Sequence, residues 1–152
     1  MKRIFVKTTL FLICLGVCSL SAHSFELGLI GGTQSNPSNA VYGLSMGSGF
    51  LIPMVKLEIE GVKLGDSGYK MLTGGIKFRP RLGIFSPYAI VGAGSEFDSF
   101  SFSFSEYNNF TFFGVGAHVH LMYLVSLRGD IRFYNYSDYN RTRFTAGIFV
   151  HL

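Results

Sequence analysis

Val55-Lys56-Leu57-Glu58-Ile59-Glu60 carries an apolar side chain at every odd position and a charged side chain at every even one. Successive side chains of a β-strand point to opposite faces, so this stretch predicts a strand with one apolar and one charged face. A helix would mix both kinds of side chain on each of its faces. The strand therefore separates an apolar environment from a polar one.

The same alternation recurs along the chain from residue 25 onward. We predict eight strands of about ten residues each, the length that an inclined strand needs to cross a bilayer. Their predicted bounds are 25–33, 40–47, 53–60, 69–79, 88–97, 110–121, 125–134 and 141–152, and 61–68 is predicted as a loop. The facing of strand 88–97 stays open, because residues 89–94 are all small or apolar.

The polar faces distinguish a membrane barrel from a soluble sandwich, which would show a similar alternation. Here they mix glycine with charges of both signs, as in Gly28 beside Glu26 and Gly75 beside Lys77. Glycine weakens a solvated strand but fits a crowded, narrow interior. The connections after the second, fourth and sixth strands are brief, whereas the others carry Gly, Asn, Asp and Ser clusters, as in outer-membrane barrels.

These observations predict an all-β fold, an eight-stranded antiparallel up-and-down transmembrane β-barrel over residues 25–152. A secreted or periplasmic sandwich is the alternative.

Residues 1–24 have the features of a signal peptide. A basic start precedes the apolar run 10–20, which is too short to span a bilayer. Ala22 and Ser24 provide the small residues that precede a cleavage site, so we expect cleavage before Phe25. The alternatives are a retained N-terminal anchor and a lipoprotein lipidated at Cys18, which follows Leu-Gly-Val.

Removal of this segment changes the composition of the mature protein. The chain has 13 Lys and Arg against 9 Asp and Glu, and loss of the three basic residues within 1–24 leaves a nearly balanced charge. We therefore expect no nucleic-acid partner. Cys14 and Cys18 are lost as well, so no disulfide, cysteine metal site, thiol nucleophile or cofactor site is expected.

The polar faces direct a set of charged side chains into the barrel. An eight-stranded barrel is just wide enough for side chains to fill it, and a charge inside needs a partner. We expect a salt-bridge network that plugs the lumen, in preference to a catalytic site or a conducting pore. Its members are Glu26, Lys56, Glu58, Glu60, Lys77, Arg79, Arg128, Asp130, Arg132 and Arg143.

Motifs in the second half of the chain resemble a known family. They are Pro87-Tyr88 with Gly92-Ala93-Gly94, then Gly114-Val115-Gly116-Ala117, then Ser126-Leu127-Arg128-Gly129-Asp130-Ile131-Arg132-Phe133-Tyr134. They are similar to the later strands of the small outer-membrane barrels of the opacity-protein and outer membrane protein A group. The resemblance implies a monomer in the bacterial outer membrane, inserted by the barrel-assembly machinery and in contact with membrane lipid and lipopolysaccharide. The chain lacks the tryptophan expected in the aromatic girdles.

His118, His120 and Ser126 invite comparison with the barrel-embedded lipid A deacylases, which use His, Ser and Glu. Those enzymes carry their His and Ser close together on one strand, and the nearest match here, residues 134–137, has no histidine. Interior packing and hydrogen bonding are the favoured roles for both histidines. A zinc site would need a third ligand such as His151 at matching height on a neighbouring strand, and no metal site is predicted.

Phe100, Phe102, Phe104 and Tyr107 lie in the longest predicted outer loop, where the phenylalanines alternate with serines. An aromatic hairpin above the membrane could contact a host or neighbouring strand. The alternative is an extension packed on itself or in the lipopolysaccharide layer. We therefore expect a non-enzymatic outer-membrane protein that contributes to envelope structure or surface contact, with a lipid A-modifying enzyme and a narrow porin-like channel as alternatives.

Overall fold

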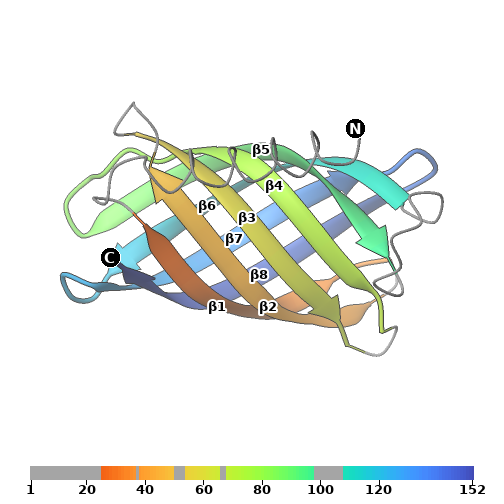
Figure 1. The fold of residues 1–152 in the computed structure, drawn as a ribbon, viewed down its shortest axis with the longest axis horizontal. Helices are drawn as coiled ribbons and strands as arrows, with labels where there is room; N and C mark the ends of the chain where they lie inside the picture. The colour runs from red at the N-terminus through yellow and green to blue at the C-terminus, as the bar shows by residue number, and fades with distance from the viewer. Residues whose placement is uncertain (1–24, 37, 50–53, 66–67, 98–107) are drawn as a thin grey trace, which may run out of the picture.

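The computed structural model describes residues 25–36, 38–49, 54–65, 68–97 and 108–152, which form one closed antiparallel barrel (Figure 1). Each strand pairs with its sequence neighbours, and the last strand pairs with the first, from Glu26 opposite His151 to Gln34 opposite Arg143. The barrel therefore has no free edge. Its strands are β1 (Glu26–Gln34), β2 (Asn39–Gly49), β3 (Val55–Leu64), β4 (Lys70–Phe78), β5 (Phe85–Phe97), β6 (Asn108–His120), β7 (Val125–Asn135) and β8 (Asn140–His151).

The predicted eight-stranded antiparallel barrel is confirmed, with corrections at some strand ends. β3 continues to Leu64 through residues that were predicted as a loop. Val62 and Leu64 point inward there, opposite Met71 and Val41, while Lys63 points outward. At this end of β3 the inner face is apolar and the outer face carries charge. The sequence analysis expected apolar side chains to face outward, so it did not recognise these residues as part of the strand. β4 ends at Phe78, one residue before Arg79.

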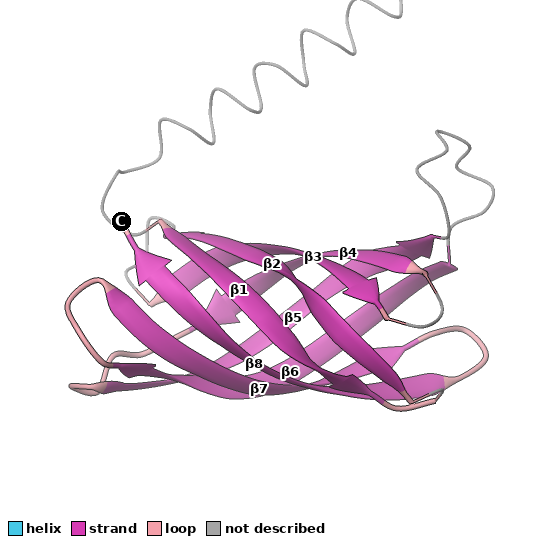
Figure 2. Ribbon diagram, turned by 90° about the horizontal axis from the view of Figure 1, so that it is seen from below, coloured by secondary structure: helices cyan, strands magenta, loops and turns pink. Residues whose placement is uncertain are grey.

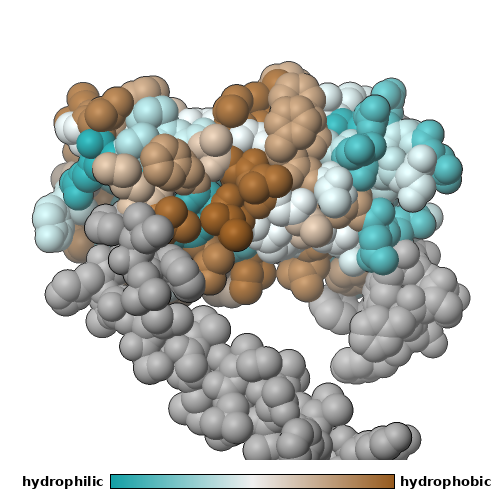
Figure 3. Space-filling view, turned by 90° about the horizontal axis from the view of Figure 1, so that it is seen from above, coloured by the Kyte–Doolittle hydropathy of each residue, from teal (hydrophilic) through white to brown (hydrophobic). Residues whose placement is uncertain are grey.

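The outer face of the barrel is apolar, and the inner face carries buried charge. Glu26, Lys77, Arg132 and Arg143 are completely buried, although charged side chains are almost never fully buried unless paired. Figure 3 shows apolar side chains over the middle of the surface and hydrophilic ones at its right-hand end. Outward residues that are more than half exposed include Leu29, Leu44, Ile59, Leu72, Ile76, Val91, Phe113, Val115, Phe144 and Ile148.

This polarity is the reverse of that of a soluble domain, and it matches a barrel whose outer surface meets lipid. The closed ring of strands also overturns the sandwich alternative, which needs two separate sheets. In the ranges that the structure describes, no helix is long and apolar enough to cross a bilayer.

Interior glycines make room for aromatic rings on neighbouring strands. A Cβ atom added to Gly28 would lie 2.4 Å from the ring of Phe149, and one added to Gly94 would lie 2.7 Å from the ring of Phe110. At Gly28 a side chain is excluded unless the Phe149 ring moves, and at Gly94 the backbone oxygen of Leu72, 2.4 Å from the added atom, excludes one as well. The glycines on the inner face are therefore required by packing, as the sequence pattern predicted.

Two rims bound the barrel, and hairpin connections lie at both (Figure 2). The terminal rim contains the start of β1, the end of β8 and connections 50–54, 79–84 and 121–124; the loop rim contains connections 35–38, 65–69, 98–107 and 136–139. Only 98–107 is clearly longer than the rest, so the predicted difference in length between the rims rests on that one connection. Positive φ angles at Asn36 and Gly83 suit residues that tolerate the left-handed region.

Candidate functional site

Side chains fill the lumen in successive groups between the two rims. The histidine–serine cluster (Ser86, His118, His120, Ser126 and His151) lies near the terminal rim. The charged layer consists of the ten charged residues predicted to face inward. The apolar layer, toward the loop rim, contains Ile30, Val41, Val62, Leu64, Met71, Phe110, Phe112 and Tyr134.

Glu26 joins the cations of β3 and β4 at one side of the charged layer. Its Oε1 accepts a hydrogen bond from Lys77 Nζ at 2.8 Å, and its Oε2 accepts one from Arg79 Nη1 at 2.6 Å. Lys56 Nζ lies 3.5 Å from the same Oε2. Glu26 thus pairs with three cations, and Lys77 is shared with Glu58, so each buried or partly buried cation of this group has an acidic partner.

Glu58 and Glu60 bind arginines from the opposite wall of the barrel. Arg128 donates from Nη1 to Glu58 Oε2 and from Nη2 to Glu60 Oε2, each at 2.9 Å. Arg132 Nη2 donates to Glu58 Oε1 at 2.6 Å, and Arg143 donates to Glu60. Because β3 lies opposite β7 in the ring of strands, the ion pairs of Glu58 with Arg128 and Arg132 cross the lumen.

Asp130 completes the charged layer. It accepts hydrogen bonds from the Tyr88 hydroxyl at 2.6 Å and from Thr145, and it lies 3.2 Å from Arg132 Nη2. Tyr88 escaped the sequence analysis because the facing of residues 88–97 was open. The structure settles that facing: Tyr88, Ile90 and Glu96 are buried on the inner side, and Val91 is exposed.

Ion pairs connect all ten residues of the charged layer into one network. Lys77 links the Glu26 group to Glu58, Arg128 links Glu58 to Glu60 and Asp130, and Glu60 adds Arg143. Every residue of the set that was predicted to face inward lies in the lumen. What sequence alone did not provide was the partners, which depend on register across strands far apart in the chain.

The apolar layer caps the charged layer on the side of the loop rim. The Arg132 guanidinium lies 5.4 Å from the ring centroid of Phe112, and that of Arg143 lies 4.9 Å from the ring of Tyr134. These are cation–π contacts, which add attraction where water is excluded. The rings therefore stabilise the two guanidinium groups from the side of the loop rim.

One ion pair outside the charged layer lies at the loop rim, and the sequence analysis did not predict it. Arg141 Nη1 lies 2.8 Å from Glu96 Oε2, and the Tyr136 hydroxyl donates to the same oxygen at 2.7 Å. Burial and the nearby Glu96 carboxylate raise the pKa of Tyr136 above its usual value. The open facing of residues 88–97 hid Glu96 from the sequence analysis.

The histidine–serine cluster brings together residues that the sequence left on separate strands. Ser126 Oγ lies 3.0 Å from His118 Nδ1 and 2.7 Å from His151 Nε2, and His151 Nδ1 lies 3.5 Å from Glu26 Oε2. The His151 ring is 5.9 Å from that of His118, so it does reach matching height. Even so, the described residues hold no group of three His, Cys, Asp or Glu placed to bind a metal.

The remaining site predictions fall outside the described residues. These are the surface-contact residues Phe100, Phe102, Phe104 and Tyr107 and the predicted signal peptide 1–24.

No protein-family model and no curated protein sequence matches the chain. Its structure is similar to the N-terminal β-barrel domain of Pseudomonas aeruginosa OprF, with a TM-score of 0.73 and 15% identity over 86% of this chain and 98% of that one. The fold is that of the small outer-membrane β-barrels.

Two further small outer-membrane barrels are similar to the chain. Ail of Yersinia pestis matches with a TM-score of 0.60 and 15% identity over 86% of this chain and 99% of that one. The outer membrane enzyme PagL matches with a TM-score of 0.55 and 11% identity over 84% of this chain and 99% of that one. Because one of these small outer-membrane barrels is an enzyme, the fold does not decide function, which depends on the side chains of this chain.

Proposed function

We propose that the protein is a non-enzymatic β-barrel of a bacterial outer membrane that contributes to envelope structure or surface contact. The observation that carries the proposal is the ten-residue ion-pair network across a barrel whose outer face is apolar. An apolar exterior needs lipid around it, and a filled interior offers no route for a solute. A membrane scaffold is the role that requires neither a pore nor a reactive group.

Export and partners follow from the same proposal. Residues 1–24 direct export and are removed before Phe25, and the barrel-assembly machinery inserts the chain as a monomer. Membrane lipid and lipopolysaccharide then surround the barrel. The aromatic residues Phe100, Phe102, Phe104 and Tyr107 provide the surface contact.

Single cysteines test the facing on which the proposal depends. Leu127 and Ile148 point outward, whereas Ser126 and Thr145 are buried in the lumen. In protein folded into liposomes, a lipid-soluble maleimide dye should label cysteines at 127 and 148. Brominated lipid should then quench the fluorescence of the attached dye. Cysteines at 126 and 145 should react only after unfolding, because alternate positions face opposite sides. Equal labelling at all four positions would contradict the barrel in lipid.

Resistance to SDS provides an independent check. A membrane barrel stays folded in SDS until it is boiled, since every strand is paired on both sides. The unboiled protein should migrate differently from the boiled protein on a gel. Identical migration, together with failure to partition into liposomes, would overturn the proposal.

A second candidate function is ester hydrolysis, favoured by one observation. Ser126 Oγ, His151 and Glu26 follow the order of nucleophile, base and orienting carboxylate. Ser126 is fully buried, however, which leaves an ester no access to its hydroxyl. A fluorophosphonate probe should leave wild-type protein unlabelled, and lipid A mass spectra should be the same with and without it. If the probe labels the wild-type protein and does not label the Ser126→Ala variant, the result would favour the enzyme.

A further inference from the structure

The positive side chains of the charged layer outnumber the negative ones. Its acids are Glu26, Glu58, Glu60 and Asp130, and its cations are Lys56, Lys77, Arg79, Arg128, Arg132 and Arg143. The three arginines of β7 and β8 can each be matched with one acid, in the pairs Arg128–Asp130, Arg132–Glu58 and Arg143–Glu60. Glu26 is then the acid left for Lys77 and Arg79.

The excess positive charge lies at the terminal end of the lumen. Lys77 and Arg79 each have an acidic partner in Glu26, but two positive charges there face one negative charge. Lys56 contacts Glu26 as well, and the imbalance remains when Lys56 is left out of the count. Because a buried charge needs compensation, this end of the lumen favours an anion from outside the chain.

The sequence places no further acidic side chain at the terminal rim. Connections 50–54, 79–84 and 121–124 contain no Asp or Glu, and neither do residues 1–24. The acids outside the charged layer belong to the end of β5 or to the connections of the loop rim; they are Asp66, Glu96, Asp98, Glu106 and Asp138. The barrel thus has its surplus of acids at one rim and its surplus of cations at the other.

Hydrogen-bonding groups gather around Glu26 in what we call the terminal mouth, which consists of Glu26, Arg79, Ser86, His120 and His151. Arg79 Nη1 lies 2.6 Å from Glu26 Oε2, and His151 Nδ1 lies 3.5 Å from the same oxygen. The ring centroids of His120 and His151 are 5.1 Å apart, and His120 Nε2 lies 3.1 Å from Ser86 Oγ. Five strands or strand ends therefore bring these groups to one place.

His118 has a buried nitrogen next to the terminal mouth. Its Nδ1 lies 3.0 Å from Ser126 Oγ, whereas its Nε2 has no hydrogen-bond partner among the described residues. The side chain is completely buried, and its ring lies 5.9 Å from that of His151. Leaving a buried polar atom unpaired is costly, so this nitrogen also favours a polar ligand at this end of the lumen.

Arg79 is the side chain best placed to hold an anion. Within the described residues its guanidinium bonds Glu26 through Nη1 alone, which leaves its other N–H groups for a second acceptor. The planar guanidinium can bind two oxygens of one phosphate at once. The side chains of Arg79 and His151 are 8% and 17% exposed, so the terminal mouth is open to water.

We propose that the terminal mouth binds the phosphate group of a small soluble ligand, held by Arg79 and His120 beside the excess positive charge. A phosphate monoester carries a charge of about −1.5 to −2 at pH 7, which compensates more of the excess than one carboxylate does. A divalent cation would meet repulsion from the same charge. The strands separate these inward side chains from lipid on the outer face, so the ligand enters from the water at the terminal rim.

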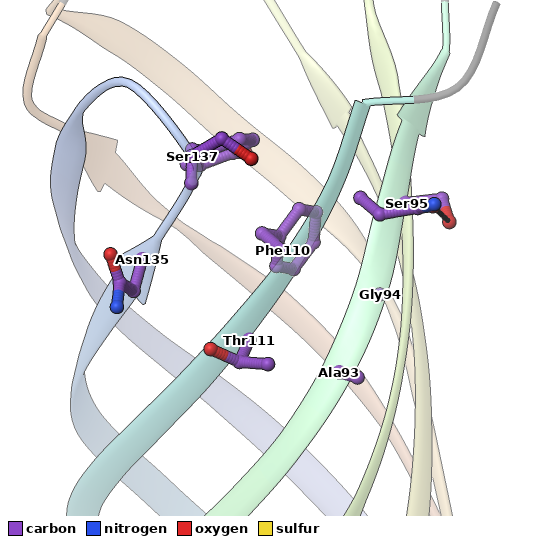
Figure 4. A pocket seen from close by; sticks show the side chains of 9 residues that line it. Ala93, Gly94, Ser95, Phe110, Thr111, Asn135 and Ser137 are labelled. Carbon is purple, nitrogen blue, oxygen red and sulfur yellow. Dashed lines mark hydrogen bonds between the residues drawn. The ribbon is translucent and has the colours of Figure 1, made fainter.

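The loop rim differs from the terminal mouth. A groove of about 660 Å³ lies there over β5, β6 and β7, and Figure 4 shows its lining. Its polar side chains are neutral, namely Ser95, Asn109, Thr111, Asn135, Tyr136 and Ser137. Arg141 at this rim is matched one to one with Glu96. Arg141 is therefore the matched control for Arg79.

Unfolding of the folded protein in a neutral detergent tests the proposal, with inorganic phosphate as the probe. A ligand that binds only the folded state raises the unfolding midpoint as its concentration rises. Phosphate should raise the midpoint above its value in sodium chloride or acetate of equal ionic strength, and the rise should saturate. Arg79→Gln should increase the half-saturating phosphate concentration about tenfold, and Arg79→Lys should increase it less. Arg141→Gln should lower the midpoint equally in all three salts and leave the half-saturating concentration unchanged.

A second variant keeps the test open if Arg79→Gln does not show the gel shift of a folded barrel on boiling. His120→Leu should increase the half-saturating phosphate concentration about threefold. Isothermal titration calorimetry with phosphate should give the same order of affinities.

Three results would overturn the proposal. One is a midpoint that is no higher in phosphate than in chloride or acetate, which would mean general screening of charge. Another is an unchanged half-saturating concentration in the Arg79 and His120 variants. The third is stabilisation by phosphatidylglycerol micelles that exceeds that by inorganic phosphate and is lost in Arg79→Gln, which would assign the phosphate to a lipid.

Discussion

Glu58 on β3 and Arg132 on β7 meet across the lumen, with Arg132 Nη2 donating to Glu58 Oε1 at 2.6 Å. The strands lie on opposite walls of the ring, and both side chains are almost completely buried. If one of the two charges is removed, the other stays buried and keeps only its remaining ion pairs, which are Lys77 and Arg128 for Glu58 and Glu60 and Asp130 for Arg132. The pair therefore connects the two walls of the barrel and makes each dependent on the other.

Loss of the Glu58 charge should destabilise the barrel strongly. Glu58→Gln removes one of the acids that contact Lys77, Arg128 and Arg132, and breaking a buried pair costs roughly 3 to 5 kcal/mol. Urea unfolding in lipid vesicles measures the loss. Arg81→Gln, at an exposed turn position, should stay within about 0.5 kcal/mol of wild type.

A double-mutant cycle tests the cross-lumen pair itself. Glu58→Gln combined with Arg132→Gln should cost less than the sum of the single substitutions, with a coupling of about 0.5 to 3 kcal/mol. Additive losses would mean that the two side chains do not stabilise each other.

Substitution of an interior glycine should be costly, whereas substitution of an outward one should not. Gly28→Ala forces the Phe149 ring to move, and such overpacking costs about 1 to 3 kcal/mol. Gly129→Ala places its methyl group in open space on the lipid face and should be neutral. Phe149→Leu should partly rescue Gly28→Ala in the same unfolding assay. Equal changes in the free energy of unfolding for the two alanine substitutions would contradict the contact between Gly28 and the Phe149 ring.

The loop rim should lose stability in alkaline solution through Tyr136. The folded state favours its neutral hydroxyl, which donates to Glu96, so the pKa is raised above the unfolded value of about 10. Its contribution is full below that pH and is lost as the pH rises toward the folded pKa. The stability difference between wild type and Tyr136→Phe, about 1 kcal/mol at pH 8, should shrink as the pH rises above about 10. A constant difference would mean that Tyr136 does not titrate with folding.

The wild-type barrel should conduct no steady ion current in planar bilayers. Side chains from the terminal rim to the loop rim fill the lumen, and the salt bridges of Glu58 and Glu60 cross it. An eight-stranded barrel leaves no water channel once its interior is filled. Stable, voltage-independent openings of purified protein would favour the narrow channel over the scaffold.

Strands and their facing were predictable because lipid and lumen impose opposite chemistry on alternate positions. Glu58 and Ile59 show that contrast at its strongest, and the prediction held there. It failed where the contrast is weak. Val62 and Leu64 are apolar yet point inward. The small residues before Glu96 show no alternation of apolar and polar side chains, so the facing of that strand could not be predicted.

The contacts of the lumen were not predictable in the same way. Glu26 meets Lys77, 51 positions along the chain, and Arg128 meets Ser45, 83 positions away. Such pairs depend on the register of every intervening strand and on the closure of β1 against β8. That closure also places His151 Nδ1 3.5 Å from Glu26 Oε2, a contact between the two ends of the barrel that strand periodicity alone could not show.

The seating of aromatic rings on interior glycines constrains how this sequence can diverge. The three nearest atoms to a Cβ added at Gly28 all belong to the Phe149 ring, so these two residues share one fixed volume. A larger residue at the glycine is compatible only with a smaller one at its partner, so a drift in one position selects for a compensating change in the other. Among descendants of this sequence, positions 28 and 149 should therefore co-vary, and the ring could change strand without altering the width of the barrel.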